Sequence, residues 1–403
     1  MESMVTFHSW KYTNLDRPDP LPILLGGLPF YHGIGSLYTG RAPLYHLTVS
    51  LIIKKLKIKE TIIQFYIFRL FSFFLFMFTV YFTYLSANLV FKDNIGYTLA
   101  GVCLAGLLPQ FVIISNSINQ VVAVILLMSI FLYIIFYSLY KEKNLGALLF
   151  GPLLITLGLY THRAALFMIP PFLVYLLILF IKSLKEKSKL IKYLAVVSVL
   201  LVLIIGVYFI SSYILPDSFL EKVSRESGVK TLLSELNRFI HYFTNGSDLQ
   251  GAESVFQFMD GFFKSFWYFA GWLRFGYLVD IYSILKLIYI FSVIGIIKYI
   301  CSYIRRREIS IDFRSFLILA AIVLPIILGT LIHCFPKYHI AQGRYLFPAI
   351  SALGILFVMG LKEIAPKRLE RWVPIFIIFG FILLDIYTLF HPLMRVFYFF
   401  RNM

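Results

Sequence analysis

The chain has 403 residues, of which 60% are hydrophobic and 14% are charged, and its formal net charge at pH 7 is +17. Several windows of about 20 residues carry almost no charge, and this is the length that an α-helix needs to cross a bilayer. These values exclude an ordinary soluble domain, and the continuous apolar runs lack the period-two alternation of a transmembrane β-barrel. The sequence therefore predicts an all-α polytopic membrane protein.

The positive charge and the cysteines exclude further classes. In a soluble protein a net charge this positive would suggest nucleic acid. In a membrane protein it is explained by loops that fix the topology and touch anionic headgroups, so we expect membrane lipids and no nucleic acid as partners. Cys103, Cys301 and Cys334 lie in or beside apolar segments without paired spacing. They predict neither a disulfide framework nor a zinc site.

The N-terminal segment, residues 1–61, contains no predicted span, and its start lacks the apolar run of a cleavable signal peptide. Between Pro43 and Ile58, several leucines and isoleucines fall at helical spacing ahead of a lysine-rich tail: Leu44, Leu47, Leu51 and Ile52. This pattern is typical of an amphipathic helix that lies in the membrane interface.

Ten segments after residue 61 are apolar enough to form transmembrane helices. Six fall within residues 62–214 and four within residues 278–403, on either side of a long loop at 215–277. The predicted spans are residues 62–91, 95–115, 118–140, 145–161, 164–182, 190–214, 278–300, 314–334, 343–361 and 372–392.

Basic residues are concentrated in every second short loop, and the positive-inside rule predicts that these loops face the cytoplasm. The basic residues of these loops are Lys92, Lys141, Lys143, Lys182, Lys185, Lys187, Lys189, Lys192, Lys298, Arg305, Arg306, Arg307, Arg314, Lys362, Lys367, Arg368 and Arg371. The intervening short loops hold only Arg163, Lys337 and Arg344. Residues 1–61 and 215–277 are then predicted to lie on the external side.

The long external loop is predicted to carry a helix on the membrane surface. Residues 232–243 place their leucines and phenylalanines on one helical face, and a packed core helix is the alternative. Further along, an aromatic group between residues 262 and 275 includes Trp267, Tyr268 and Trp272. Aromatic residues of this kind are suited to the membrane interface.

Six short motifs follow one another along the chain. They are Arg-Ala-Pro-Leu-Tyr-His-Leu (41–47), Phe-Arg-Leu-Phe-Ser (68–72), Ser-Asn-Ser-Ile-Asn-Gln (115–120), Thr-His-Arg (161–163), Phe-Trp with Gly-Trp (266–267 and 271–272) and Gly-Arg-Tyr-Leu-Phe-Pro (343–348). In this order they resemble elements of the GT-C superfamily of membrane glycosyltransferases, which includes the protein mannosyltransferases that use dolichyl-phosphate mannose. The resemblance extends over most of the chain from Arg41 to Gly360.

The resemblance implies a GT-C-like helical bundle with its active site on the external side of the membrane. That side is periplasmic if the protein belongs to the cell membrane of a prokaryote, and lumenal if it belongs to the endoplasmic reticulum. The implied activity is transfer of a sugar from a polyprenyl-phosphate donor to a glycan, lipid or protein acceptor. The need for a divalent metal stays open, and the eight His residues show no metal-ligand spacing.

Arg344 is the first candidate for binding the phosphate of the donor lipid. It lies at the mouth of an apolar segment, where a guanidinium is costly unless it reaches the interface or meets an anion. Arginine also matches a phosphate in a bidentate way. Arg163 and His339 lie on the same predicted side and are candidates to assist. An interfacial anchor beside Tyr345 is the alternative role for Arg344.

The carboxylate base is harder to place. The family carries its key carboxylate just after a first helix that this chain lacks, so we expect such a helix to precede Met1. Asp16 and Asp19 lie in what remains of that loop and are the candidates for the base. Asp260 and Glu253 are further candidates. Gln120 stands where many relatives have Asp, and a neutral amide is no general base.

Polar residues within or beside the predicted spans have mostly structural explanations. Arg69 is expected to pair with a carboxylate or to extend outward. Asn116 and Asn119, with the neighbouring Gln120, are expected to cap a turn. Asp385 lies in the last predicted span without an obvious partner, which makes it a candidate functional residue.

Two other functions fit the same composition. A transporter or lipid flippase would show inverted repeats and broken helices with charged groups near the midplane, and no convincing repeat is visible. A non-catalytic relative, acting as a scaffold in envelope-glycan assembly, would be compatible with the missing first helix and with Gln120. Fold resemblance alone does not confer activity.

Overall fold

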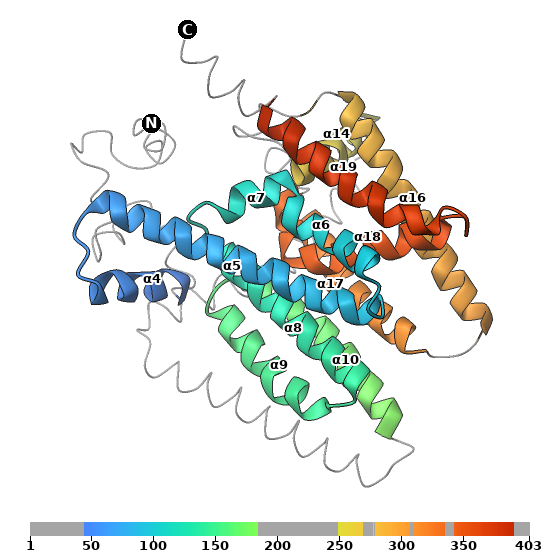
Figure 1. Ribbon diagram of the computed structural model, residues 1–403, viewed down its shortest axis with the longest axis horizontal. Helices are drawn as coiled ribbons and strands as arrows, with labels where there is room; N and C mark the ends of the chain where they lie inside the picture. Colours follow the sequence, from blue (N-terminus) through green and yellow to red (C-terminus); the bar gives the residue numbers. More distant parts are fainter. Residues whose placement is uncertain are drawn as a thin grey trace.

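The computed structural model describes residues 44–183, 249–268, 277, 279–306, 310–334 and 342–390. Among these residues the secondary structure is helical, and no strand occurs (Figure 1). In chain order the helices are α4 (Leu44–Lys55), α5 (Thr61–Val90), α6 (Ile95–Leu107), α7 (Pro109–Ser115), α8 (Val121–Lys141), α9 (Asn144–Leu159), η2 (Arg163–Met168), α10 (Ile169–Ser183), α14 (Leu249–Trp267), α16 (Val279–Arg306), α17 (Ile311–Cys334), η4 (Gly343–Ala349), α18 (Ile350–Ile364), η5 (Glu370–Trp372) and α19 (Val373–Thr388).

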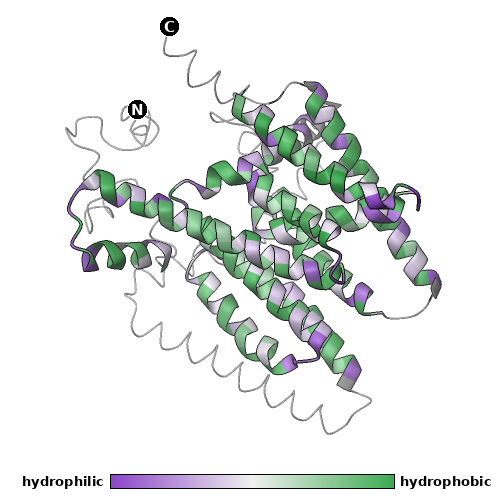
Figure 2. Cartoon of the chain, in the orientation of Figure 1, coloured by the Kyte–Doolittle hydropathy of each residue, from purple (hydrophilic) through white to green (hydrophobic). Residues whose placement is uncertain are grey.

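Within the described ranges, seven helical segments are long and apolar enough to cross a membrane, or up to eight if the bent pair α6–α7 is one span. Each predicted span overlaps a helix of the structure except residues 190–214, which lie outside the described ranges. The helix found for residues 145–161 is α9, whose 16 residues make it shorter than a full span. The helices are largely hydrophobic, and hydrophilic residues gather near their ends (Figure 2). By helix length and hydropathy the chain is an integral, multi-pass membrane protein.

The span predicted over residues 95–115 is broken in the structure. Its two halves, α6 and α7, are bent by 56°. The break lies at Leu108, whose ψ of 111° is extended because a residue that precedes a proline is pushed out of the helical region. Pro109 then begins α7, where its missing N–H costs nothing. The apolar pattern predicted the length of this span but not its bend.

α18 lies at the centre of the bundle. Of the window tested in the span Gly343–Ile364, which contains α18, 72% is buried inside the protein, compared with 11% for the span of α16. Close backbone contacts explain how neighbouring helices reach it. A Cβ on Gly354 would lie 2.4 Å from the carbonyl oxygen of Gly101 on α6, and a Cβ on Gly360 would lie 2.1 Å from that of Ser292 on α16. Small residues at such crossings are typical of helix packing in membranes.

A buried group of hydroxyls fixes α18 against two further helices. The Oγ of Ser351 lies 2.6 Å from the Oγ1 of Thr83 on α5 and 2.8 Å from the Oγ of Ser129 on α8. In an apolar environment such interhelical hydrogen bonds each contribute about 0.6 kcal/mol. They add less stability than the close backbone packing, but they fix the register of three helices.

The loops predicted to face the cytoplasm lie together at one end of the bundle, here called the basic end. Lys92 Nζ is 2.8 Å from a carboxylate oxygen of Asp312, which joins the α5–α6 loop to the start of α17. The Oγ of Ser315 donates to the phenol oxygen of Tyr140 at 3.1 Å, which joins α17 to the end of α8. Further ion pairs near this end are Lys182 with Glu142, Lys298 with Glu363 and Lys362 with Glu370. The loops that the charge pattern assigns to one side therefore share one end.

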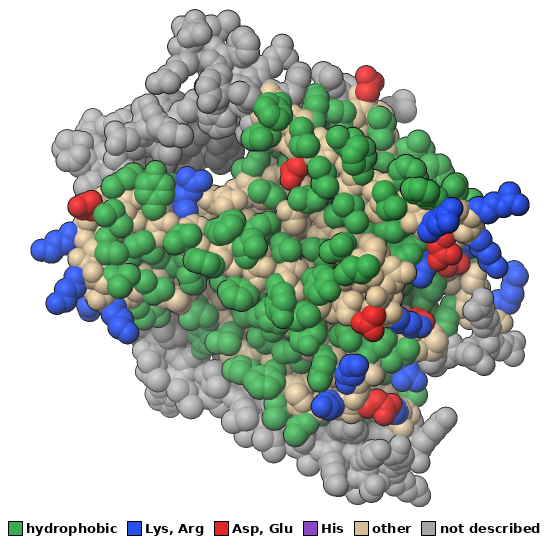
Figure 3. Space-filling model, viewed as in Figure 1, with side chains coloured by type: hydrophobic (Ala, Val, Ile, Leu, Met, Phe, Trp, Pro, Cys, Tyr) green, Lys and Arg blue, Asp and Glu red, His purple; other side chains and the backbone are tan. Residues whose placement is uncertain are grey.

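The other end of the bundle, here called the opposite end, is built from shorter elements. It contains η2, η4, α7, the turn after α7 and the last residues of α14. η4 packs against α14, α17 and α8, and η2 packs against α9 and α8. On the face shown in Figure 3, Lys and Arg side chains gather at the basic end and around the connection between α4 and α5, with a broad band of hydrophobic side chains between.

The helix predicted between Pro43 and Ile58 is present as α4, which folds back alongside the first half of α5 (Figure 1). Tyr45 and Ile53 are buried against Phe68 of α5. Leu47 and Leu51, on the predicted membrane-facing side, are exposed. The apolar face that the sequence assigns to the interface is thus the face that the protein leaves uncovered.

The aromatic group after residue 262 does not have its predicted interfacial position. Trp267 and Tyr268, at the end of α14, are 3% and 0% exposed and belong to the hydrophobic core. The Trp267 ring lies 5.9 Å from that of Phe381 on α19. These aromatic side chains therefore dock α14 onto the bundle instead of facing lipid headgroups. Trp272 and the predicted surface helix at 232–243 lie outside the described residues.

Candidate functional site

Among the residues predicted to bind the donor phosphate, Arg344 is the one whose side chain the structure describes. It is exposed on η4, and its guanidinium carbon lies 5.8 Å from the ring centroid of Tyr345. Arg163 is the first residue of η2, although only its backbone is described. Three further predicted residues lie outside the described ranges: Asp16, Asp19 and His339. The structure therefore brings the backbone positions of two predicted arginines to the opposite end.

η4 is held in place by close contact with α14. The backbone N–H of Gly343 donates to the Oγ of Ser265 at 2.7 Å. Phe347, which is 0% exposed, has its ring 5.9 Å from that of Phe266. These buried contacts on either side of Arg344 fix its backbone while its side chain stays exposed. A guanidinium on a fixed backbone is suited to binding a phosphate group.

A row of aromatic rings connects η4 with α5. The ring of Phe347 lies 5.2 Å from that of Phe111 on α7, which lies 5.6 Å from Phe76 on α5. Phe76 is 6.4 Å from Phe73 on the same helix. Phe73 is 39% exposed and lines a hollow on the side of α5.

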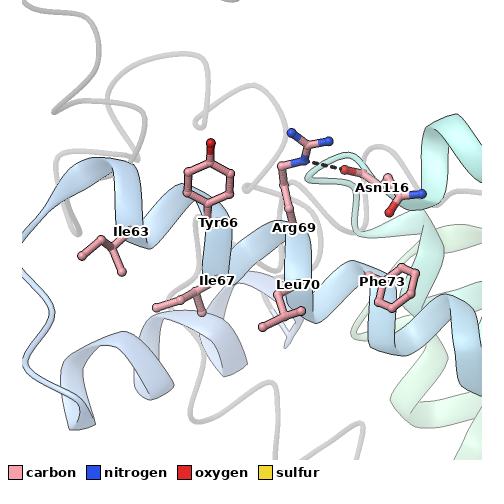
Figure 4. A pocket seen from close by; sticks show the side chains of 7 residues that line it. All are labelled: Ile63, Tyr66, Ile67, Arg69, Leu70, Phe73 and Asn116. Atoms are coloured by element: carbon pink, nitrogen blue, oxygen red, sulfur yellow. Dashed lines mark hydrogen bonds between the residues drawn. The ribbon is translucent and has the colours of Figure 1, made fainter.

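This hollow has a volume of about 390 Å³ and surrounds Arg69. Its lining is apolar apart from three polar side chains, those of Tyr66, Arg69 and Asn116 (Figure 4). The Nε of Arg69 donates to the backbone oxygen of Asn116 at 2.9 Å, and the guanidinium carbon lies 5.7 Å from the ring centroid of Phe65. Arg69 therefore pairs with a carbonyl instead of the carboxylate that was one predicted partner.

The two asparagines of the turn that supplies this carbonyl have their predicted structural role, but Gln120 makes no capping hydrogen bond with its side chain. The Oδ1 of Asn119 accepts a hydrogen bond from the N–H of Val121 at 2.9 Å, and the Nδ2 of Asn116 donates to the Val112 oxygen at 2.8 Å. The buried Oε1 of Gln120 has no hydrogen-bond partner among the described residues. The two asparagines thus have a structural role. Gln120 can form hydrogen bonds, but as a neutral amide it cannot act as a general base.

Asp260, one of the further candidates for the base, serves a different purpose in the structure. Its carboxylate forms ion pairs with Lys264 on the same helix and with Lys286 on α16. Burial raises the pKa of the Asp260 carboxyl, but hydrogen bonds and charge from the two lysines outweigh it, so the pKa lies below its ordinary value. A carboxylate with a lowered pKa is a weaker base. Asp260 ties α14 to α16.

The Asp260 ion pairs predict a pH dependence. A carboxyl with a lowered pKa stabilises the folded state above its unfolded pKa, near 3.9, and loses this contribution as the pH falls through the folded value. We expect Asp260→Asn to lower the Tm in detergent by about 2 °C at pH 7, and the difference from wild type to shrink as the pH falls below about 4 and through the folded pKa. Asp280→Asn, at an exposed carboxylate in the first turn of α16, is the control. A difference independent of pH would contradict the assignment.

The remaining candidate groups form no further cluster. The carboxylate of Asp385, on α19, has no hydrogen bond or ion pair with the described residues, although it lies near Tyr277. No group of three His, Cys, Asp or Glu side chains that could hold a metal ion occurs in the described part of the chain. The side chain of Glu253 is outside that part.

The features of the opposite end that sequence reasoning missed are the Arg69 hollow and the row of rings. Both depend on contacts between segments far apart in the chain, as between Arg69 and Asn116. The chain matches no family model, no curated protein and no solved structure. What is established is its class, an integral membrane protein with a bundle of apolar helices.

Proposed function

We propose that the protein transfers a sugar from a polyprenyl-phosphate donor to an acceptor at the membrane face of its opposite end. One observation carries the proposal. Motifs that resemble GT-C elements, although separated along the chain, contact one another there. Tyr45 lies 2.6 Å from Ser72, and Arg69 is bonded to Asn116.

The later motifs meet in the same way. The ring of Phe347, in the motif 343–348, packs on that of Phe266 in the motif 266–267. Leu44, in the first motif, donates its N–H to the oxygen of Tyr160, which directly precedes the motif 161–163. Motifs scattered at random would have no reason to pair at one end of a bundle.

The reaction assigns roles to the predicted residues. The acceptor oxygen or nitrogen attacks the anomeric carbon of the donor, and the bond from that carbon to the phosphate oxygen breaks. The departing polyprenyl phosphate takes the electron pair, and Arg344 stabilises the charge that develops on it. A carboxylate, for which Asp16 and Asp19 are proposed, takes the proton of the acceptor.

The test is the rate of sugar transfer by Arg344→Ala. Removing one charge-stabilising donor typically lowers kcat by about 100-fold or more. We expect such a loss in membranes supplied with polyprenyl-phosphate mannose or glucose, and partial activity with Arg344→Lys. The matched control is Arg371→Ala, because Arg371 lies 5.6 Å from the Trp372 ring in a similar arrangement at the basic end. Normal transfer by Arg344→Ala would contradict its role.

A non-catalytic relative is the second candidate, favoured by Gln120 with its unpartnered Oε1. Such a protein would bind the lipid without turning it over. A transporter is less well supported. The broken pair α6–α7 contains no Asp, Glu, Lys, Arg or His side chain, and Leu108 at its break is fully buried. The break therefore offers no charged group for coupling ions.

A further inference from the structure

We propose that the hollow around Arg69 is a docking site for the phosphate end of a polyprenyl-phosphate lipid, with the first part of its chain lying along α5. In naming that lipid the inference rests on the proposed function. It assigns the lipid a binding site on α5, separate from Arg344 on η4.

The polar side of the hollow is arranged for an anion. Asn116 holds the Arg69 guanidinium through Nε, and among the described residues no partner occupies the two terminal nitrogens. The Tyr66 hydroxyl and this guanidinium project to the same side of α5, as residues three apart on a helix do (Figure 4). Among the described residues, no carboxylate lines the hollow. Two free N–H edges with a neighbouring hydroxyl match the oxygens of a phosphate.

The apolar side of the hollow is suited to a hydrocarbon chain. Ile63, Leu70 and Phe73 line it and are 41%, 54% and 39% exposed. The hollow of about 390 Å³ is open along the side of α5, so a hydrocarbon chain can reach it from the membrane. Leu70 and Phe73 continue from Arg69 toward the membrane-spanning part of α5.

The depth of Arg69 agrees with a headgroup position. α5 runs without a break from Thr61 to Val90, next to Lys92 at the basic end. At 1.5 Å per residue, the distance from Val90 back to Arg69 is about 30 Å, which equals the thickness of the hydrocarbon core. A lipid phosphate in the leaflet at the opposite end therefore lies at the height of the guanidinium.

The charge around the hollow favours an anionic lipid. α4 ends in Lys54 and Lys55, and the connection to α5 adds Lys57 and Lys59. All four are exposed, and they precede the hollow on α5. Such a cluster raises the local concentration of anionic headgroups. It also explains why this end departs from the positive-inside pattern.

The experiment measures binding of fluorescent polyprenyl monophosphate to the purified full-length protein in nanodiscs of neutral lipid. We expect Arg69→Ala to weaken binding by about 10- to 100-fold, because it removes charge-assisted hydrogen bonds. Arg69→Lys should retain part of the affinity, and Arg371→Ala, at an exposed arginine of the basic end, should bind as wild type does. Equal binding by wild type and Arg69→Ala would overturn the assignment.

Competition identifies the occupant. Unlabelled polyprenyl monophosphate should displace the probe, whereas polyprenol without a phosphate should not. Equal displacement by phosphatidylglycerol would show an ordinary phospholipid site, and equal displacement by inorganic phosphate would show that the chain is not recognised. Either result would overturn the inference.

Binding and transfer separate this inference from the proposed function. Binding that depends on Arg69, without transfer of any sugar, would leave the docking site in place and remove the enzymatic proposal. If transfer depends on Arg344 but binding does not depend on Arg69, the enzymatic proposal stands and the docking site is ruled out.

Discussion

Replacing Gly360 with alanine is expected to force α16 and α18 apart and to destabilise the protein by about 3 kcal/mol, near the upper end of the range for overpacking. A Cβ at Gly360 would lie 2.1 Å from the carbonyl oxygen of Ser292 and 2.6 Å from its Oγ. The first of these atoms is backbone, so no rotamer change relieves the contact. Gly295 on α16 faces the same crossing, and a Cβ there would lie 1.8 Å from the Gly360 oxygen.

The matched control is Gly380→Ala on α19, where an added Cβ meets nothing within 4 Å. Alanine there is expected to be neutral or slightly stabilising, since it reduces the freedom of the unfolded chain. Equilibrium unfolding in mixed detergent, followed by circular dichroism, compares the two variants. If Gly360→Ala unfolds at the same detergent fraction as Gly380→Ala, the helices do not cross as closely as described.

The positions of the helices were accessible from the sequence, because a membrane span leaves a signal in every window that contains it. Helix α17 shows this best, since the window within Ile311–Ile332 has a mean hydropathy of 2.7. The alternation of basic loops likewise predicts which ends lie together, and the Lys92–Asp312 pair confirms that two of them do. Pro109 could have predicted the bend at Leu108, but the apolar residues on both sides of it favoured a single continuous span.

The contact partners of individual side chains could not be predicted from the sequence in the same way. Arg69 is 47 residues from Asn116, and Asp260 is 26 residues from Lys286. A hydropathy profile carries no information on which helices touch, so these pairs depend on the packing. Arginine at a membrane edge indicates an anion or the interface, and only the structure shows that Asn116 holds Arg69 by Nε alone.

Arg69 and Arg344 are held in place in different ways. Arg69 lies on a continuous helix of 30 residues, and its guanidinium is held by the backbone oxygen of Asn116. Arg344 lies on a 3-10 helix of seven residues whose position depends on α14. A change in the contact between η4 and α14 should therefore affect Arg344 and leave Arg69 in place.

Gly343→Ala is expected to make that change. An added Cβ would lie 2.3 Å from the backbone nitrogen and 2.4 Å from the Cα of Phe266, so η4 and α14 cannot keep their contact. The hydrogen bond from the Gly343 N–H to Ser265 is lost with it. We expect a destabilisation of about 3 kcal/mol, together with loss of the sugar transfer proposed for Arg344. Limited proteolysis should cut within residues 249–268 far faster than in wild type.

Gly261→Ala supplies the control on the same helix, because a Cβ at Gly261 meets nothing within 4 Å. This variant should resist protease as wild type does. Ser265→Ala should fall between the two, since it removes one hydrogen bond and leaves a buried N–H unpaired, at a cost of about 1–3 kcal/mol. The decisive comparison is with Arg344→Ala, which should lose transfer while α14 stays protected. If Gly343→Ala retains both protection and transfer, then α14 does not position Arg344. Binding of polyprenyl phosphate should persist in Gly343→Ala, because Asn116 and α5 hold Arg69 without help from η4.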